Sequence, residues 1–396
     1  MFLMLRFLAV SLVALILSLT GVVAQASAPV ENAIPASPPI PAAIPAPTIA
    51  ASSYLLLDVA SHQVLLAANA DEPREPASLT KLMTAYLAFS ALRDKTISLN
   101  QKVSISEQAK SAVGSRMFAD PRVPVSVDEL LHGMIIQSGN DASIALAELI
   151  AGDETAFSAM MNARAQKMGM TKTHFVNSTG LPDPQHYSTA ADLVKLAAAL
   201  IRDFPDYYPL YSQKEYRYNN ITQKNRNRLL TMDPYVDGVK TGYTESAGWC
   251  LIASAKRGDR RLLSVVLGAA SDHARASENQ KLLNWGYQAF DVVQLYPAGQ
   301  PVSTLPVWKG DAPKVAVGFL EDRYLSVPKG QGDKLQAKLM TQEPLTAPIR
   351  KGQKVGAMQV QFAGTHVTEF PLVAQEDIAI GSLLRRGWDA MRLWFK

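Results

Sequence analysis

The chain has 396 residues, enough for two or three compact domains, and 48% of them are hydrophobic, which excludes global disorder. Its net charge of +4 comes without a long basic run, so we expect no nucleic-acid partner. A single cysteine, Cys250, excludes an internal disulfide, and large domains bury enough apolar surface to fold without one.

Residues 1–28 have the pattern of an export signal peptide. Arg6 precedes an apolar run over residues 7–19, and cleavage after Ala26 or Ala28 fits the rule that small residues flank the cleaved bond. An uncleaved membrane anchor is the alternative, but the apolar run is short for a full span. No cysteine directly follows the run, which excludes a lipoprotein anchor.

The next segment, residues 29–50, is rich in proline and alanine. This composition favours extended, polyproline-like conformations and is unsuited to building a core. We therefore expect a linker without a function of its own.

Residues 51–292 contain predicted strands at both ends and predicted helices between them. Two apolar runs, 54–58 and 63–67, predict a hairpin, and a second hairpin is predicted over residues 249–267. Pro76 opens a helix that runs to about residue 92, because proline is tolerated in a first helical turn. Further helices are predicted over residues 128–150, 154–168, 189–201 and 274–290. This order indicates one α/β (α+β) domain built on an antiparallel sheet.

The pattern changes at about residue 293. Residues 293–380 show short alternating runs, such as 314–317 and 358–362, separated by glycine and proline. These runs predict a small all-β domain with the architecture of a sandwich.

Residues 381–396 predict an amphipathic helix. Its two sides carry Leu384, Trp388, Met391 and Phe395 on one stripe and Arg385, Asp389, Arg392 and Lys396 on the opposite flank. An apolar face with tryptophan beside a basic face is typical of a helix that lies in a membrane surface. The alternative is a helix docked on its own protein. The terminal position and the export signal favour the membrane.

Three short motifs carry the candidate chemistry, and the first is Ser-x-x-Lys at Ser78 and Lys81. Residues three apart share a helix face, so the lysine amine can reach the serine hydroxyl. Lys81 acts as a base only when it is neutral, which a buried setting with a second cation nearby would achieve. A second match, Ser326 and Lys329, lies in the predicted β domain, and the proline between them argues against helical geometry.

The second motif is Ser-x-Asn at Ser138 and Asn140. The same spacing occurs at Ser98 and Ser277, but only Ser138 lies in a glycine-containing break between two apolar helical runs. A loop between core helices can present polar groups to a cleft. Ser138 would relay a proton, and Asn140 would hold Lys81 or the substrate amide.

The third motif is Lys240-Thr241-Gly242. Gly242 lets a substrate backbone approach the edge of a strand, while Lys240 offers a cation and Thr241 a hydroxyl for a carboxylate. Together the motifs supply a nucleophile, a base, a proton relay and an anion-binding strand, as serine acyl transfer without histidine requires. The six histidines form no zinc-peptidase pattern, so we expect no metal and no cofactor.

With these motifs in order on an exported chain, the sequence resembles the low-molecular-mass penicillin-binding proteins, D-alanyl-D-alanine carboxypeptidases of the DacA type in serine peptidase family S11. The resemblance covers nearly all of residues 54–396. Longer strings carry it, at residues 69–71, 75–83, 137–142, 174–175, 180–181 and 236–242. It implies a serine β-lactamase/transpeptidase-like domain with an antiparallel sheet and a helical subdomain, then a β sandwich and a membrane-anchoring helix.

The resemblance also implies a role for each motif residue. Ser78 would attack the carbonyl of the penultimate D-alanine, and Lys81 would take its proton. Ser138 would pass a proton to the departing D-alanine, whose carboxylate Lys240 and Thr241 would bind.

Three further residues belong to this implied site. The backbone N–H groups of Ser78 and Tyr243 would form the oxyanion hole. Arg226 and Arg275 lie where the family places basic residues near the site. Tyr243 stands where the family has histidine, a change that keeps the backbone donor but can alter substrate preference or the acylation rate.

The resemblance implies peptidoglycan stem peptides, β-lactam antibiotics and a membrane surface as partners, at the periplasmic face of the bacterial inner membrane. A D,D-endopeptidase that cuts cross-links remains open as an alternative. A β-lactamase is less consistent, because its Glu-x-x-Leu-Asn motif has Tyr218 in place of leucine between Glu215 and Asn219. A non-catalytic cell-wall protein is disfavoured by the intact Ser78 and Lys81.

Overall fold

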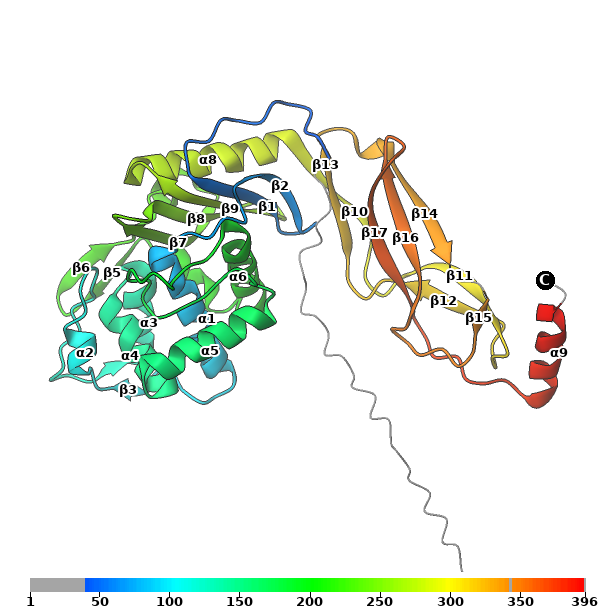
Figure 1. Cartoon of the computed structure of the whole chain (residues 1–396), viewed down its shortest axis with the longest axis horizontal. Helices are drawn as coiled ribbons and strands as arrows, with labels where there is room; N and C mark the ends of the chain where they lie inside the picture. The colour runs from blue at the N-terminus through cyan, green and yellow to red at the C-terminus, as the bar shows by residue number, and fades with distance from the viewer. Residues whose placement is uncertain (1–39, 342–343, 395–396) are drawn as a thin grey trace, which may run out of the picture.

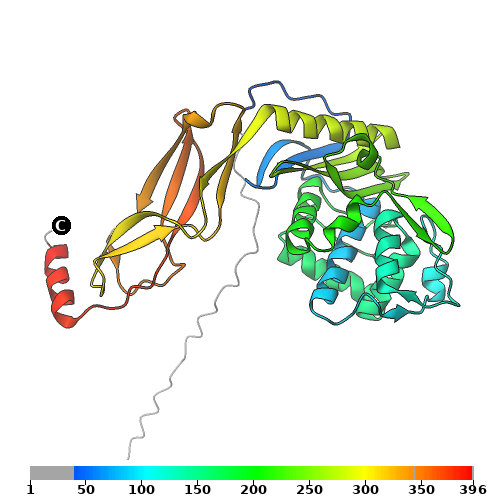
Figure 2. The same cartoon turned by 180° about the vertical axis from the view of Figure 1, so that it is seen from behind.

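The computed structural model describes residues 40–341 and 344–394. The predicted signal peptide, the first part of the predicted linker, and Phe395 and Lys396 lie outside them. Figure 1 shows one body of helices and a sheet, a second body of strands, and a C-terminal helix at the far end of the second body. Figure 2 shows the same arrangement from behind. The predicted order of an α/β domain, an all-β domain and a terminal helix is confirmed.

The first body is built on a five-stranded antiparallel sheet in the order β2-β1-β9-β8-β7, so strands from both ends of the domain pair at its centre. The strands are β1 Ser53–Asp58, β2 Gln63–Ala68, β7 Val236–Thr244, β8 Gly248–Arg257 and β9 Arg260–Ala269. Both predicted hairpins and the antiparallel sheet are confirmed.

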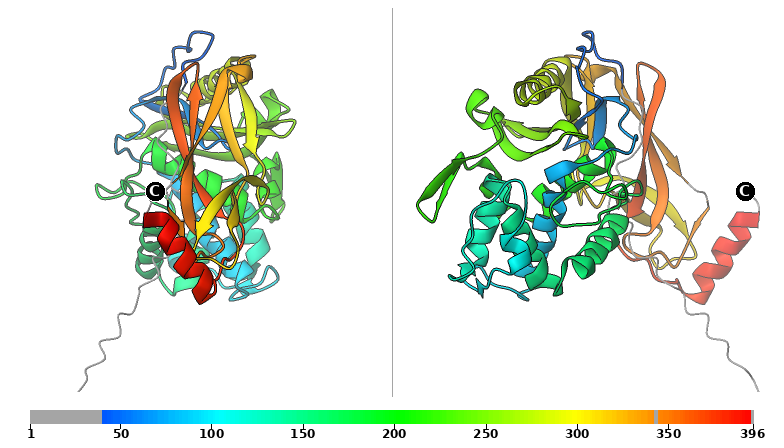
Figure 3. Two further views of the ribbon diagram at one scale, coloured as in Figure 1. Left: turned by 90° about the vertical axis from the view of Figure 1, so that its right-hand side faces the viewer. Right: turned by 60° about the vertical axis from the view of Figure 1, so that its left-hand side comes forward.

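Helices cover both faces of this sheet because its strands are apolar on both sides. In β1, Leu55 and Leu57 join the core of one face, and Leu56 joins the core of the other. Helix α8 (Asp272–Ala289) lies on one side of the sheet and the helical subdomain on the other, as Figure 3 shows. That subdomain contains α1 Lys81–Arg93, α3 Val127–Ile136, α4 Asn140–Ala151, α5 Glu154–Lys167 and α6 Ala190–Asp203.

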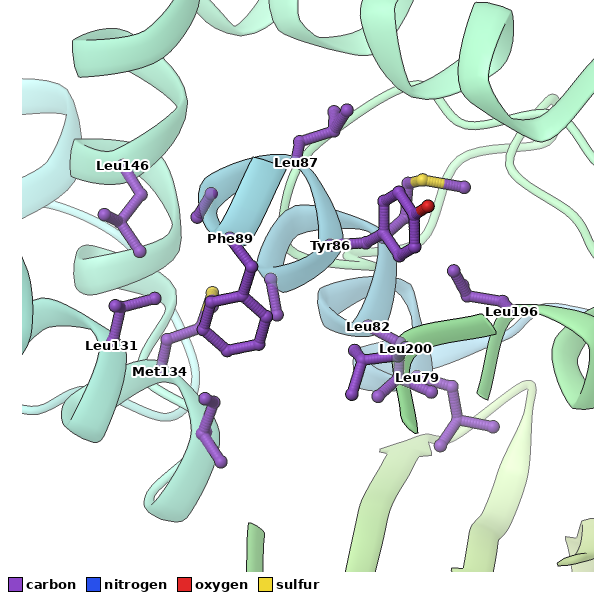
Figure 4. Close-up of a cluster of buried hydrophobic side chains, with 14 of the residues drawn as sticks. Leu79, Leu82, Tyr86, Leu87, Phe89, Leu131, Met134, Leu146, Leu196 and Leu200 are labelled. Atoms are coloured by element: carbon purple, nitrogen blue, oxygen red, sulfur yellow. The ribbon is translucent and has the colours of Figure 1, made fainter. Parts of the chain in front are cut away.

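Helix α1 lies at the centre of the larger core. All of its residues except Arg93 are buried, so it shows no amphipathic stripe. Figure 4 shows Phe89 beside Met134 of α3, and Leu82 beside Leu200 of α6. This packing on several sides fixes the position of the first residue of α1, the candidate base.

Short elements complete the domain, and two of them refine the predicted helices. The helix predicted from Pro76 begins as a 3-10 turn and continues as α1, and the helical stretch 128–150 is divided into α3 and α4 by the loop that carries Ser138. The short elements are η1 Ala77–Thr80, β3 Lys102–Val103, α2 Glu107–Lys110, β4 Val125–Ser126, η2 Tyr208–Ser212, β5 Glu215–Tyr218, β6 Ile221–Lys224 and α7 Leu229–Met232.

The second body contains two sheets among the described residues. Six strands lie in the order β14-β16-β17-β12-β11-β15, and β10 pairs with β13. Leu325 of β13 shares one core with Val317 and Leu372 of the larger sheet. The elements are β10 Phe290–Tyr296, β11 Pro301–Trp308, β12 Lys314–Gly318, β13 Arg323–Pro328, η3 Gly332–Lys334, β14 Leu335–Thr341, β15 Leu345–Thr346, β16 Lys354–Phe362 and β17 Thr365–Ala374. Strand β10 follows α8 directly, and the boundary at residues 292 and 293 stays a prediction.

The described end of the proline-rich segment packs on both bodies. Ile40 joins the core of the β domain, and Ile49 joins the core between the sheet and α8. Trp285 Nε1 donates a hydrogen bond of 2.9 Å to the carbonyl oxygen of Pro45. The segment builds no core of its own; as an extended chain it buries single isoleucines on surfaces that other elements provide, and its role as a linker stays a prediction.

Helix α9 (Leu383–Trp394) is docked on the β domain by its polar flank. Asp389 is buried there and accepts a hydrogen bond of 2.7 Å from the backbone N–H of Lys309, and Arg385 donates one of 2.8 Å to the carbonyl oxygen of Asp311. The opposite side of the helix exposes Leu383, Leu384, Trp388, Met391 and Trp394. Within the described residues, no helix has the length and apolar character needed to cross a membrane.

Candidate active site

Ser78 lies half-buried in η1, directly before α1. Ala77 precedes it with a φ of 47°, in the left-handed region that residues other than glycine rarely adopt. Gly180 packs against this turn, because a Cβ at that position would overlap the carbonyl oxygen of Ala77. The tight contact holds the turn that presents the serine hydroxyl.

Lys81 Nζ has three polar neighbours. It lies 3.1 Å from Ser78 Oγ, 2.6 Å from Asn140 Oδ1 and 2.6 Å from the carbonyl oxygen of Thr179. A neutral amine has two N–H donors and one lone pair. When both N–H groups are donated to Asn140 and Thr179, the lone pair faces the hydroxyl of Ser78. The neutral form of Lys81 is therefore arranged as a base toward the serine.

The surroundings of Lys81 favour this neutral form. Burial lowers the pKa of Lys81 to about 7; the charge of Asp141 opposes this shift and that of Arg226 adds to it. An ordinary lysine is almost entirely protonated at neutral pH, whereas one with this pKa is partly neutral there. Lys81 was expected to act as a base if it is buried and has a second cation nearby. Both conditions are met, by its burial and by Arg226.

Ser138 and Lys240 form a second polar pair in the site. Ser138 lies in the loop between α3 and α4 with a φ of 65°, again in the left-handed region. Lys240, on β7, donates a hydrogen bond of 2.8 Å from Nζ to Ser138 Oγ. Burial, and then the charge of Lys81, lower the pKa of Lys240. A carboxylate bound beside Lys240 would raise this pKa again, so the pair is suited to bind an anion.

Strand β7 passes close to the nucleophile at Gly242. A Cβ on Gly242 would lie 3.0 Å from the carbonyl oxygen of Pro76 and 3.2 Å from the backbone nitrogen of Ser78. The next residue, Tyr243, lines the same cavity as Ser78, and its ring packs on Trp249 with the centroids 4.2 Å apart. The Tyr243 ring therefore forms part of the outer wall of the cavity.

The two arginines implied by the resemblance occupy different positions. Arg226 is exposed, lines the cavity over Ser78 and donates a hydrogen bond of 3.2 Å from Nε to the carbonyl oxygen of Gln137. Arg275 is buried and donates one of 3.0 Å to the carbonyl oxygen of Gly242. Arg226 thus lines the cavity directly, while Arg275 supports the strand.

One cavity of about 290 Å³ lies over Ser78 and is bordered by Asn140, Arg226 and Tyr243. The other matches to the short motifs lie away from it. Ser326 is buried in β13 of the second body, where its hydroxyl contacts that of Ser61 at 2.7 Å. The sequence context of the two Ser-x-x-Lys matches therefore distinguished Ser78, which lines the cavity, from Ser326, which does not.

Two contributors to the site carried no usable signal in the sequence. Thr179 contributes its backbone carbonyl, which any residue type supplies. Asp141 accepts hydrogen bonds of 2.9–3.1 Å from the backbone N–H groups of Met117, Phe118 and Ala119 and so anchors a neighbouring loop. An acidic residue in a first helical turn is common, so its contact with a distant loop was not predictable.

Comparison with known families matches the chain in two blocks. Residues 41–271 match the family described as D-alanyl-D-alanine carboxypeptidase. Residues 290–379 match the family described as penicillin-binding protein 5, C-terminal domain. The two blocks correspond to the two bodies of the structure.

Individual relatives match over most of their length. D-alanyl-D-alanine carboxypeptidase DacC of Escherichia coli K12 is 42% identical over 358 residues, which cover 88% of this chain and 90% of that protein. DacA of the same strain is 38% identical, covering 88% of this chain and 89% of that protein. The crystal structure of penicillin binding protein 5 from Haemophilus influenzae matches with a TM-score of 0.83 and 38% identity, covering 85% of this chain and 99% of that one. An ampicillin-bound structure of penicillin-binding protein D2 from Listeria monocytogenes matches with a TM-score of 0.57 and 31% identity, covering 62% of this chain and 100% of that one.

Proposed function

The chain belongs to the D-alanyl-D-alanine carboxypeptidase family, and on this premise we propose how its residues release the terminal D-alanine of a peptidoglycan stem peptide. It is a serine-type hydrolase that acts through an acyl-enzyme. The contact of 3.1 Å between Lys81 Nζ and Ser78 Oγ, in a setting that lowers the pKa of the lysine to about 7, carries the residue assignments.

Acylation begins at Ser78. Lys81 takes the hydroxyl proton as Ser78 Oγ attacks the carbonyl carbon of the penultimate D-alanine. The backbone N–H groups of Ser78 and Tyr243 stabilise the negative charge on the carbonyl oxygen. The close approach of Gly242 to η1 supports this pairing of donors from two elements.

The departing D-alanine needs a proton on its amine and a site for its carboxylate. The proton that Lys81 took from Ser78 passes through Ser138 to the leaving amine. Asn140 keeps Lys81 in place meanwhile. Lys240 and Thr241 bind the carboxylate, and Arg226 adds positive charge at the open side of the cavity. The bond of 2.8 Å between Lys240 and Ser138 supports a direct connection between carboxylate binding and proton delivery.

Hydrolysis returns the enzyme to its first state. A water molecule attacks the ester on Ser78, gives its proton to Lys81, and the serine oxygen takes that proton as the C–O bond breaks. A β-lactam reacts at the same carbonyl position, but its amine stays tethered to the acyl group. We therefore expect penicillins to inhibit covalently at Ser78.

D-alanine release from a pentapeptide stem tests this mechanism. We expect release by the wild-type protein and none by Ser78→Ala. The matched control is Ser326→Ala, which removes the serine of the second Ser-x-x-Lys match and should keep the wild-type rate. Release by Ser78→Ala, or equal loss in both variants at unchanged thermal stability, would contradict the assignment.

We also propose that α9 holds the protein on a membrane surface, at the periplasmic face of the inner membrane, after export and cleavage behind Ala26 or Ala28. Two observations support this: Leu384 and Trp388 are 88% and 59% exposed, and the helix contacts its own protein through Asp389 on the opposite flank. A helix docked by its polar side presents its apolar side outward, as interfacial helices require.

Sedimentation with phosphatidylethanolamine–phosphatidylglycerol vesicles tests the membrane proposal. The double variant Leu384→Glu/Trp388→Glu should weaken vesicle binding at least about tenfold, since two large apolar side chains no longer enter the interface. Leu320→Glu changes an apolar residue that is 57% exposed on the β domain and should leave vesicle binding unchanged. Equal binding by both variants would refute the anchor.

A further inference from the structure

One buried histidine, His186, has no role in the proposed chemistry but contacts the turn that carries the nucleophile. Its side chain is 2% exposed, and its ring packs edge-on against that of Phe175 with the centroids 5.7 Å apart. Its Nε2 lies 2.8 Å from Oγ1 of Thr80, the residue directly before Lys81. A buried imidazole costs free energy unless both ring nitrogens have partners, so the second nitrogen shows what else this side chain holds.

The partners of the two ring nitrogens fix the tautomer of His186. The backbone N–H of Val176 donates a hydrogen bond of 3.1 Å to Nδ1, so this nitrogen presents a lone pair. In the neutral ring the other nitrogen then carries the proton, and Nε2–H donates to Thr80 Oγ1. Burial lowers the pKa of His186 to about 4. The neutral ring with both hydrogen bonds is thus the form present at neutral pH.

Val176 leads into the turn that supplies the carbonyl contact of Lys81. Asn177 Oδ1 accepts hydrogen bonds of 3.1 Å and 2.7 Å from the backbone N–H groups two and three residues further on, which closes residues 177–180 into a tight turn. Within this turn the carbonyl oxygen of Thr179 accepts the hydrogen bond of 2.6 Å from Lys81 Nζ. The position of the turn therefore decides where that carbonyl lies relative to the amine.

His186 thus connects two segments that both determine the position of the catalytic lysine. Its bond to Thr80 holds the residue that is joined to Lys81 by a peptide bond. Its bond to Val176 holds the chain directly before the turn of residues 177–180. The segments are also in close contact, because a Cβ at Gly180 would lie 2.8 Å from Thr80 Oγ1. A small shift of either segment therefore changes the surroundings of the amine.

We propose that His186 is a positioning residue for Lys81 and acts by tying η1 to the turn of residues 177–180. It does not line the catalytic cavity, so it acts through the lysine rather than on the substrate. The bond to Thr80 is the critical one, because it holds the start of α1 against the turn. The inference rests on the proposed function, in which Lys81 faces the nucleophile as a base, and names what holds that base in place.

Two substitutions of His186 separate its two hydrogen bonds. The amide nitrogen of glutamine reaches the position of Nε2 and keeps a donor toward Thr80. Asparagine is one bond shorter, reaches only the position of Nδ1 and keeps an acceptor toward Val176. Gel-based labelling of Ser78 by penicillin measures acylation in the full-length protein. We expect His186→Gln to stay within about threefold of wild type and His186→Asn to be at least about tenfold slower, because a catalytic group displaced by about 1 Å can cost about 10²-fold in rate.

The pH dependence of acylation is the readout that a merely stabilising histidine would not move. In His186→Asn the loosened turn admits water to the amine of Lys81, and weaker desolvation raises the pKa of this lysine. The rising limb of the rate should therefore lie at higher pH in His186→Asn than in wild type, and stay in place in His186→Gln. An unmoved limb in His186→Asn would overturn the inference.

Thr80→Val tests the same bond from its other end and is independent of how the histidine variants fold. It removes the hydroxyl acceptor at nearly unchanged volume and should slow acylation as His186→Asn does. In the double variant Thr80→Val/His186→Asn, the second substitution should add less than about threefold, because the two residues act through one hydrogen bond. Losses that multiply in full would overturn the inference.

The matched control is His366→Asn, the same substitution at an exposed histidine on β17 of the second body, which should label at the wild-type rate. Equal rates in Thr80→Val, His186→Asn and this control would overturn the inference and leave the proposed function intact. Failure of the wild-type protein to acylate at Ser78, or to release D-alanine from a pentapeptide stem, would instead overturn the proposed function.

Discussion

The catalytic cavity and the C-terminal helix both show unusual side-chain burial, but of opposite kinds: the cavity buries charged side chains, and the helix exposes large apolar ones. Lys81 and Lys240 are only 1% and 3% exposed, although charged side chains normally remain in solvent. Leu384 and Trp388 are 88% and 59% exposed and lie on one contiguous helix face. Burial in the first region lowers the pKa of an amine to the range a base needs. Exposure in the second leaves an apolar face for a surface outside the protein.

The two regions also differ in how firmly they are held. Lys81 has polar contacts from η1, from α4 and from the loop that carries Thr179, and lies on a helix buried on almost all sides. The described contacts of α9 with the β domain include the hydrogen bonds of Asp389 and Arg385 and the packing of Arg392 over the ring of Trp308. Most side chains of α9 are exposed, which favours a low free energy of local opening, whereas the site lies on buried elements and stays rigid.

The largest effect expected in the catalytic region is that of Lys81→Arg. A guanidinium group remains protonated at any usable pH and cannot take the proton of Ser78. Acylation by penicillin should slow by about 10³-fold, within the range of lost general-base catalysis. Stopped-flow or gel-based labelling measures the rate.

The control for this substitution is Lys195→Arg, a lysine on α6 whose Nζ donates to the carbonyl oxygen of Gly169 at 2.7 Å. It should label at the wild-type rate. Labelling of Lys81→Arg within tenfold of wild type, with normal thermal unfolding, would mean that Lys81 is not the base.

A glycine pair tests the rigidity of the catalytic region. Gly180 and Gly152 have similar φ values, 82° and 89°, but a Cβ at Gly180 would overlap Ala77 whereas one at Gly152 meets nothing within 4 Å. Gly180→Ala should lower the free energy of unfolding by about 3 kcal/mol or more, from the conformation and the overlap together. Gly152→Ala, at φ 89° and ψ −37°, should cost about 2 kcal/mol, from the conformation alone.

Thermal and urea unfolding measure both glycine variants, and the acylation rate gives a second readout. Gly180→Ala should also slow acylation, because the overlap displaces the turn that holds Ser78. Equal destabilisation of the two variants would contradict a tight contact between Gly180 and η1.

The smallest effect is expected at the attachment of α9. Asp389→Ala removes a hydrogen bond of 2.7 Å to the backbone of Lys309 and should loosen the helix by about 1 kcal/mol. Hydrogen exchange of the peptides from α9 should accelerate correspondingly, while exchange in α1 stays the same. Asp377→Ala removes a similar bond of 2.7 Å to the backbone of Lys351 elsewhere in the β domain and serves as the control. Identical exchange in α9 for both variants would contradict the docked arrangement.

Much of this arrangement was predictable because its signals are local. Pairs of apolar runs predicted both hairpins of the sheet, and the break between apolar runs at Ser138 placed that serine in a loop. The exclusion of Ser326 followed from its proline-containing context. These inferences need only neighbouring residues, and the fold confirms each of them.

The features that were not predictable depend on contacts between distant segments. The carbonyl of Thr179 lies beside Lys81 only because the chain returns to α1 after four further helices, α2 to α5. Ile40 is buried on strands more than 260 residues away in sequence, such as that of Leu305. A cavity of about 540 Å³ lined by Lys214, Lys224, Arg226, Arg228 and Arg275 combines the base of the β5–β6 hairpin with α8, and no single stretch of sequence shows its charge.

The pH dependence of Ser78 acylation by penicillin tests the central claim, that buried Lys81 acts as a neutral base. Only neutral Lys81 takes the serine proton, and burial lowers its pKa to about 7. The rate constant should therefore rise about tenfold per pH unit below that value and level off above it. Mass spectrometry should place the adduct on Ser78 throughout. A rate independent of pH, or one that still rises toward the ordinary lysine value of 10.5, would contradict the account.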